Sequence, residues 1–191
     1  MGPSTGGVQS ACAEEPKMTS KVFLALRVPA DPMRAFEVFT QEIASWWQPS
    51  GLFRVSDTGD GRLAFESGQG GRLITTFEDG STFEIGRISV WEPGKRLVFA
   101  WRQANFSAEQ STEVEVCFEP VGAETRVSIE HRAWDTIPRS HAARHGFPEP
   151  ATLQRAGDWW RNSLHAFKER ICGRGDTCSQ PLPAPSMPPP R

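Results

Sequence analysis

The stretch that decides the fold is Gly70 to Arg102, which reads GGRLITTFEDGSTFEIGRISVWEPGKRLVFAWR. Two turn signals divide three runs that are rich in β-branched and aromatic residues. Asp79-Gly80 is typical of a tight hairpin, because glycine adopts the positive φ of such a turn without steric cost. Pro93-Gly94 fits a type II turn, in which proline presets the first central φ and glycine accepts a positive second one. We therefore predict a three-stranded antiparallel meander, which forms part of a curved sheet.

Alternation of apolar and polar residues predicts further strands on both sides of this meander. Upstream, we expect strands at residues 21–28, 53–56 and 62–66; downstream, we expect them at 112–119 and 125–132. The inward positions of the two downstream strands are Val114, Val116, Phe118, Val127, Ile129 and His131. Such clean alternation is typical of an antiparallel sheet with one buried and one wet face.

Helices are predicted at two places along the chain. Asp31 can cap a first helix, and Pro32 fits its first position. One long helix or two short ones with a bend are equally compatible with the apolar stripe Phe36, Phe39, Ile43 and Trp46 or Trp47. A terminal helix of about 20 residues begins near Pro150 and ends at Gly173. Its apolar stripe is Leu153, Ala156, Trp160, Leu164, Phe167 and Ile171. Residues 134–150 form a connection with one helical turn around 140–145.

Length and composition predict one domain with two tails. The 191 residues are 38% hydrophobic and include 7 Trp and 12 Phe, enough for a sizeable core. We expect a folded domain at 20–172, a disordered polar tail at 1–19 and a disordered proline-rich tail at 173–191. Met18 is an alternative start of translation, because the first strand follows it directly.

Charge and cysteine usage limit the function classes. The formal net charge of −2 gives no reason to expect nucleic acid or an acidic membrane as partner. The 4 Cys form no Cys-x-x-Cys pair, so neither a zinc signature nor a disulfide framework is indicated. No apolar run approaches the roughly 20 residues of a membrane span, and the N-terminus lacks the core of a signal peptide. We therefore expect a cytoplasmic protein that needs no cofactor.

Several motifs carry a family resemblance: Trp46-Trp47, Gly70-Gly71, the block 86–102, Thr112–Val116, Thr125–Val127 and His131. In this order and spacing, over about residues 20–171, the chain resembles the family named for the activator of heat-shock protein 90 ATPase. That family lies within the START-like, or helix-grip, superfamily. The resemblance implies an α+β fold: a strand, two short helices, a curved antiparallel sheet of about six strands, and a long helix packed across it. It also implies a cavity between this helix and the sheet, used by family members for apolar small molecules.

The first functional hypothesis is therefore binding of a small hydrophobic molecule in that cavity. The expected lining residues are Phe36, Trp47, Phe83, Trp101, His131, Trp134, Trp160 and Leu164. Simple core packing is the alternative for each of them, because ligand sites and cores are both apolar and aromatic. The family name suggests a second hypothesis, a module that binds or activates a chaperone ATPase. A third is cyclase or hydrolase chemistry within the cavity.

Histidines are the only candidates for such chemistry. His131 falls on the inner face of its strand, where Glu84 could pair with it for acid–base catalysis. A structural histidine with its hydrogen bonds satisfied is the favoured alternative. His141 and His145 have the i, i+4 spacing of metal ligands on a helix, but they lie in a predicted loop and lack the glutamate of the His-Glu-x-x-His pattern. We therefore expect no metal there.

Overall fold

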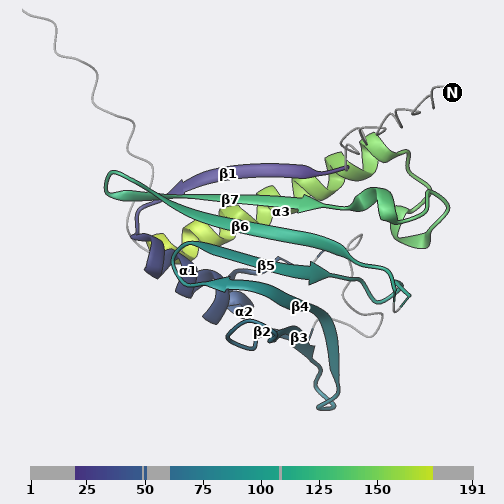
Figure 1. Ribbon diagram of the computed structural model, residues 1–191, viewed down its shortest axis with the longest axis horizontal. Coiled ribbons are helices and arrows are strands. Elements are labelled where there is room, and N and C mark those ends of the chain that lie inside the picture. Colours follow the sequence, from purple (N-terminus) through teal and green to yellow (C-terminus); the bar gives the residue numbers. More distant parts are fainter. Residues whose placement is uncertain (1–19, 49, 51–60, 108, 174–191) are drawn as a thin grey trace, which may run out of the picture.

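The computed structural model describes residues 20–48, 50, 61–107 and 109–173 (Figure 1). The predicted strand at 53–56, both predicted tails and Met18 lie outside these residues. The elements are β1 (Val22–Val28), α1 (Pro32–Gln41), α2 (Ile43–Trp46), β2 (Arg62–Phe65), β3 (Arg72–Thr76), β4 (Thr82–Glu92), β5 (Arg96–Trp101), β6 (Thr112–Val121), β7 (Glu124–Arg132), the 3-10 turns Trp134–Thr136 and Ala142–Arg144, and α3 (Glu149–Cys172).

The strands form one antiparallel sheet in the order β1-β7-β6-β5-β4-β3-β2. The first strand therefore closes one edge beside the last strand, while all other neighbours are consecutive in the chain. In Figure 1, α3 runs across the sheet face formed by β1, β7 and β6, and α1 and α2 lie beside it. This arrangement confirms the predicted α+β helix-grip fold. None of the helices in the described ranges is long and apolar enough to cross a membrane.

The meander of β3, β4 and β5 has the predicted turns. Gly80 has a φ of 81° and Gly94 a φ of 71°, so both glycines occupy the left-handed region as expected. The strand β4 carries irregularities against both neighbours, at Ile85 toward β3 and at Ser89 toward β5. Extra residues of this kind bend a strand and increase its twist. They curl the sheet around its inner face.

The helical segment after β1 is divided into two helices, which settles an alternative that the sequence left open. The carboxylate of Asp31 accepts from the backbone N–H groups of Met33 and Arg34, so it caps α1 as predicted. Near the other end, the buried Thr40 hydroxyl donates to the carbonyl of Phe36. Side chains that bond back in this way bend helices. The chain leaves α1 at Glu42, and α2 then places the two tryptophans Trp46 and Trp47 beside α3.

Strand register brings four strand ends together at one end of the sheet. Trp101 at the end of β5 lies opposite Thr112 at the start of β6. In turn, β6 pairs with the end of β7, and His131 of β7 lies opposite Val22 at the start of β1. Two connections, residues 102–111 and 133–148, leave the sheet from this end. The candidate site lies where these connections meet the first half of α3.

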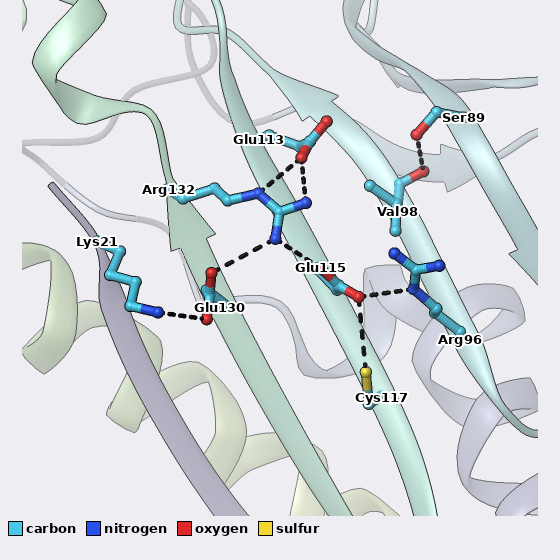
Figure 2. Close-up of polar contacts among 9 residues, drawn as sticks. All are labelled: Lys21, Ser89, Arg96, Val98, Glu113, Glu115, Cys117, Glu130 and Arg132. Atoms are coloured by element: carbon cyan, nitrogen blue, oxygen red, sulfur yellow. Dashed lines mark hydrogen bonds and ion pairs between the residues drawn. The ribbon is translucent and has the colours of Figure 1, made fainter. Parts of the chain in front are cut away.

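The outer face of the sheet carries a ladder of ion pairs along β5, β6 and β7 (Figure 2). Glu115 at its centre accepts hydrogen bonds of 2.6 Å from both Arg96 and Arg132. Burial alone would raise the pKa of Glu115, but these two hydrogen bonds outweigh it and hold the pKa below its ordinary value. Lys21 and Arg132 also reach Glu130, which lies directly opposite Glu115. This face is therefore the wet side that the alternation predicted.

Candidate functional site

Four aromatic side chains from three elements pack on one another between the sheet and α3. These are Trp47, Trp101, Trp159 and Trp160, which we call the tryptophan cluster. The ring centroids of neighbouring members lie 4.8–5.6 Å apart. Trp101, Trp159 and Trp160 are buried, whereas Trp47 is only half-buried. The cluster therefore reaches the surface through Trp47.

Local structure explains how the adjacent tryptophans diverge. Trp46 ends α2 and turns into the core, where its indole N–H donates to the carbonyl of Val38 at 3.0 Å. Trp47 follows with extended backbone and points to Trp101 instead. On α3, Trp159 and Trp160 are both buried. The indole N–H of Trp159 donates to the carbonyl of Gln48 at 3.0 Å, which ties α3 to the segment after α2.

His131 joins the cluster to the sheet through both of its ring nitrogens. The indole N–H of Trp160 donates to Nδ1 of His131 at 3.0 Å. This bond assigns the ring proton to Nε2, which donates to the Thr112 hydroxyl at 2.8 Å. That hydroxyl in turn donates to the carbonyl of Trp101 at 3.1 Å. A chain of three hydrogen bonds thus runs from α3 through β7 and β6 to β5.

Burial keeps this histidine neutral. His131 has no exposed surface, and burial lowers its pKa from 6.5 to about 3. Both nitrogens are occupied by protein partners, so neither is left to exchange a proton with a substrate. The geometry matches a structural histidine that holds Trp160 and Trp101 in place.

The structure does not bring Glu84 to His131. Glu84 lies opposite Ile74, on the outer face of the sheet, and its carboxylate pairs with Arg72 and Arg87. The hypothesis of a His131–Glu84 pair assumed that Ile88 and Val90 mark the inner side of β4. The extra residue at Ile85 shifts the alternation between Ile88 and Glu84, so Glu84 lies on the outer face. The extra residue at Ser89 shifts it again, so Trp91 rather than Val90 packs against the core after Ile88.

The other expected lining residues fall into three places. Trp134 is buried with its ring 4.6 Å from that of His131, so it extends the cluster. Leu164 is buried one turn after Trp160 on α3. Phe36 packs on Trp91 and Phe118, in a second aromatic group away from the cluster. Phe83 is half-buried, with the guanidinium of Arg102 over its ring.

Two residues of the site were missing from the expected set. Trp159 was left out because the apolar stripe of α3 selects Trp160 and passes over its neighbour. Thr112 was left out because nothing in a strand pattern tells which residue hydrogen-bonds a buried histidine. A signal for Thr112 does exist: it starts β6 on the same face as Val114, and Val114 lies opposite His131.

His141 and His145 do not share a helical face. His141 accepts from the Ala143 N–H through Nδ1 and caps a 3-10 turn, and His145 ends that turn with a φ of 48°. Within the described parts of the chain, no group of three or more His, Cys, Asp or Glu side chains is arranged to hold a metal ion.

Among the described residues, no acceptor faces one buried polar atom of the cluster, the indole nitrogen of Trp101. The indole nitrogens of Trp46, Trp159 and Trp160 all donate hydrogen bonds. That of Trp101 is buried, and none of the described residues accepts from it. An unsatisfied buried donor costs about 1–3 kcal/mol, so such atoms are uncommon in folded proteins. The indole ring that carries this nitrogen packs on the rings of Trp47, Trp159 and His131.

Sequence comparison identifies the family. The family described as Activator of Hsp90 ATPase homolog 1-like protein matches residues 29–171, well over half of the chain. The chain belongs to this family. No curated protein matches it in sequence.

Solved structures resemble this member of the Hsp90-ATPase-activator-like family in fold. Protein MLL2253 from Mesorhizobium loti has 16% identity and a TM-score of 0.57, covering 82% of this chain and 98% of its own. CalU16 from Micromonospora echinospora has 18% identity and a TM-score of 0.53, with 86% and 78% covered. The Aha1 dimer from Colwellia psychrerythraea has 15% identity and a TM-score of 0.52, with 79% and 95% covered. At these identities the likeness is one of fold.

Proposed function

We propose that the protein binds a small aromatic or apolar molecule in its interior, against the tryptophan cluster. The observation that carries this proposal is the buried indole N–H of Trp101, which lacks an acceptor among the described residues and belongs to a ring that packs on Trp47 and Trp159. Phenylalanine would also place an aromatic ring there, without burying a donor. A bound molecule with an acceptor oxygen would satisfy this N–H while its apolar body lies on the rings.

The hydrogen-bonded chain through His131 supports binding rather than catalysis. It fixes the positions of Trp160 and Trp101 relative to one another, so two walls of the site are ordered before a ligand arrives. Preorganised walls raise affinity because less side-chain freedom is lost on binding. A catalytic role for His131 would require one of these hydrogen bonds to break.

The test is a fluorescence titration with 6-propionyl-2-(dimethylamino)naphthalene, a neutral aromatic probe whose ketone oxygen can accept a hydrogen bond. We expect one probe per chain, with energy transfer from the tryptophans. Trp101→Phe keeps an aromatic wall but removes the donor, so it should weaken binding about 5- to 10-fold, the worth of one hydrogen bond. Trp91→Phe is the matched control, because Trp91 packs on Phe36 and Phe65 in the other aromatic group. Absence of saturable binding to the unaltered protein would refute the proposal.

Interaction with a chaperone ATPase is the second candidate function, and the family description favours it. Phe23 on the edge strand β1 is 55% exposed and offers an apolar contact on the outer face. Stimulation of the ATPase of an Hsp90-type chaperone, lost in Phe23→Ser and retained in Trp101→Phe, would favour this function. The reverse pattern, no stimulation with retained probe binding, would favour the first proposal.

A further inference from the structure

Arg144 is a buried cation for which none of the described residues supplies a counter-ion. Its side chain is only 2% exposed, and it forms no ion pair with any acidic side chain in the described part of the chain. Nε donates to the carbonyl of Ile137 at 2.9 Å and Nη2 to that of Trp134 at 2.5 Å. Nη1 is buried and has no hydrogen-bond partner among the described residues.

Such an arrangement is costly. A guanidinium stays charged at all relevant pH values, and burying a charge without compensation costs several kcal/mol. The two carbonyl groups compensate only in part: residues 136–148 contain no Asp or Glu, and within the described residues neither flanking acid, Asp135 or Glu149, forms an ion pair with Arg144. Methionine or glutamine would avoid the buried charge. An anion beside Nη1 would supply the remaining compensation.

A second orphaned donor lies at the same end of the sheet. Gln103 follows β5 directly, is 1% exposed, and its Nε2 has no partner among the described residues. Its connection packs against the segment of Arg144, because Phe106 forms a small buried cluster with Ile137 and Ala143. Its backbone carbonyl accepts from the N–H of Phe106, which fixes Gln103 beside this cluster.

Both donors adjoin the tryptophan cluster. Trp134, whose carbonyl accepts from Arg144, lies with its ring against that of His131, and His131 accepts from Trp160. Gln103 is two residues from Trp101, which carries the third orphaned N–H. Among the described residues, Trp101, Gln103 and Arg144 thus each bury a nitrogen donor without a partner near this end, as does Arg102, whose guanidinium lies over the Phe83 ring. A neutral apolar ligand would satisfy at most the Trp101 indole.

We propose that the ligand is an organic acid. Its aromatic body lies on the tryptophan cluster, and its anionic oxygens accept from Nη1 of Arg144 and Nε2 of Gln103. This inference rests on the proposed function and adds the chemical class of the ligand. Arg144 supplies charge and direction, because a guanidinium binds the oxygens of an acid in a fixed geometry.

Two probes with the same ring system separate this inference from the proposed function. These are 8-anilinonaphthalene-1-sulfonate, which carries an anion, and N-phenyl-1-naphthylamine, which lacks it. We expect the full-length protein to bind the sulfonate at least 10-fold more tightly than the neutral probe. Arg144→Met should abolish this preference and leave the neutral probe bound. Arg161→Met is the matched control, because it removes an exposed positive charge from α3 and should preserve the preference.

The two probes distinguish a failure of the organic-acid inference from a failure of the proposed function. Equal affinity of the unaltered protein for the two probes would overturn the organic-acid inference while leaving the proposed function intact. Failure of both probes to bind would contradict the proposed function itself. Because Arg144→Met also removes two hydrogen bonds to backbone, circular dichroism must show that it folds. If it does not, Arg144→Lys and Gln103→Leu replace it. We expect each to reduce the preference 3-fold or more, and an unchanged preference in both would overturn the inference.

Discussion

His131 is the residue on which the interior arrangement depends most. It is fully buried, neutral, and bonded to one group on α3 and one on β6. Replacement by an apolar residue would leave the Trp160 indole and the Thr112 hydroxyl with one partner fewer inside the core. The penalty for each such buried group is about 1–3 kcal/mol.

The low pKa of His131 makes stability depend on pH. The unfolded chain binds this proton near pH 6.5, whereas the folded chain binds it only near pH 3. The stability that neutral His131 contributes is therefore fully present above about pH 6.5, and it is lost as the pH falls toward 3. Between pH 7 and pH 5 we expect the free energy of unfolding to drop by about 2 kcal/mol from this group. Urea denaturation at several pH values measures it.

His131→Gln provides the control for this dependence. Its amide can still donate to Thr112 and accept from Trp160, but it does not titrate. We expect it to lower stability at pH 7 by about 1–3 kcal/mol and to lose the His131 part of the slope. An equally steep decline between pH 7 and pH 5 in the variant would show that other groups cause it.

For a single side chain such as His131, the sequence predicts which face of the sheet it lies on, but not which residues it hydrogen-bonds. Alternation in β7 places His131 on the inner face, as the structure confirms. The partners come from a helix 29 residues later and from a strand start 19 residues earlier, and no local pattern encodes either contact. The predicted pairing of Glu84 with His131 was wrong because strict alternation along the sequence does not reveal the two extra residues in β4.

Among the elements, β6 and β7 depend on charge as well as on packing. Glu115 and Glu130 lie directly opposite one another on the outer face, where like charges repel. Arg132 bonds to both and also to Glu113, so it converts this repulsion into a connected ladder (Figure 2). The pKa of Arg132 is raised: burial opposes the rise, but the hydrogen bonds that its guanidinium donates to Glu115 and Glu113 outweigh it.

Removal of this arginine should destabilise the sheet measurably. We expect Arg132→Leu to lower the free energy of unfolding by about 1–2 kcal/mol, because two carboxylates then face each other unbridged. Arg126→Leu, which removes a more exposed pair with Glu119, should cost less than about 0.5 kcal/mol. In the Arg132→Leu background, Glu115→Gln should recover part of the loss. Equal effects of the two arginine substitutions would contradict this account.

Replacement by alanine should have opposite effects on stability at two glycines, one in β4 and one in α3. A Cβ on Gly86 in β4 would lie 1.7 Å from the carbonyl oxygen of Ala100, so the strands could not keep their spacing. A Cβ on Gly157 in α3 would lie 3.6 Å from Val22, an ordinary contact. We expect Gly86→Ala to cost more than about 3 kcal/mol and Gly157→Ala to stabilise by about 0.5–1 kcal/mol. Thermal unfolding of the two variants checks both signs.

Element boundaries were predictable because their signals are local. The turns at Gly80 and Gly94, the Asp31 cap and the end of α3 at Gly173 all coincide with the expected positions. The division between α1 and α2 was not decided by local pattern. It depends on Thr40 and on how the chain must turn to place Trp46 and Trp47 against α3.

For the molecule as a whole, the helix-grip architecture follows from a sheet with one apolar face and a long helix with one apolar stripe. The site does not follow in the same way. Aromatic residues that would line a pocket and those that fill a core have the same pattern in sequence. What distinguishes them is the orphaned polar atoms, and only a three-dimensional arrangement reveals which donors lack acceptors.

Native mass spectrometry of the protein purified from its own host tests the central claim most directly. Beside the 21.2 kDa chain, we expect a one-to-one complex of the chain with its ligand, which releases one small aromatic acid on collisional activation. Trp101→Phe and Arg144→Met should reduce its occupancy, and Arg161→Met should not. A chain that always has the mass of its sequence alone, and that also fails to bind either naphthylamine probe, would contradict the account.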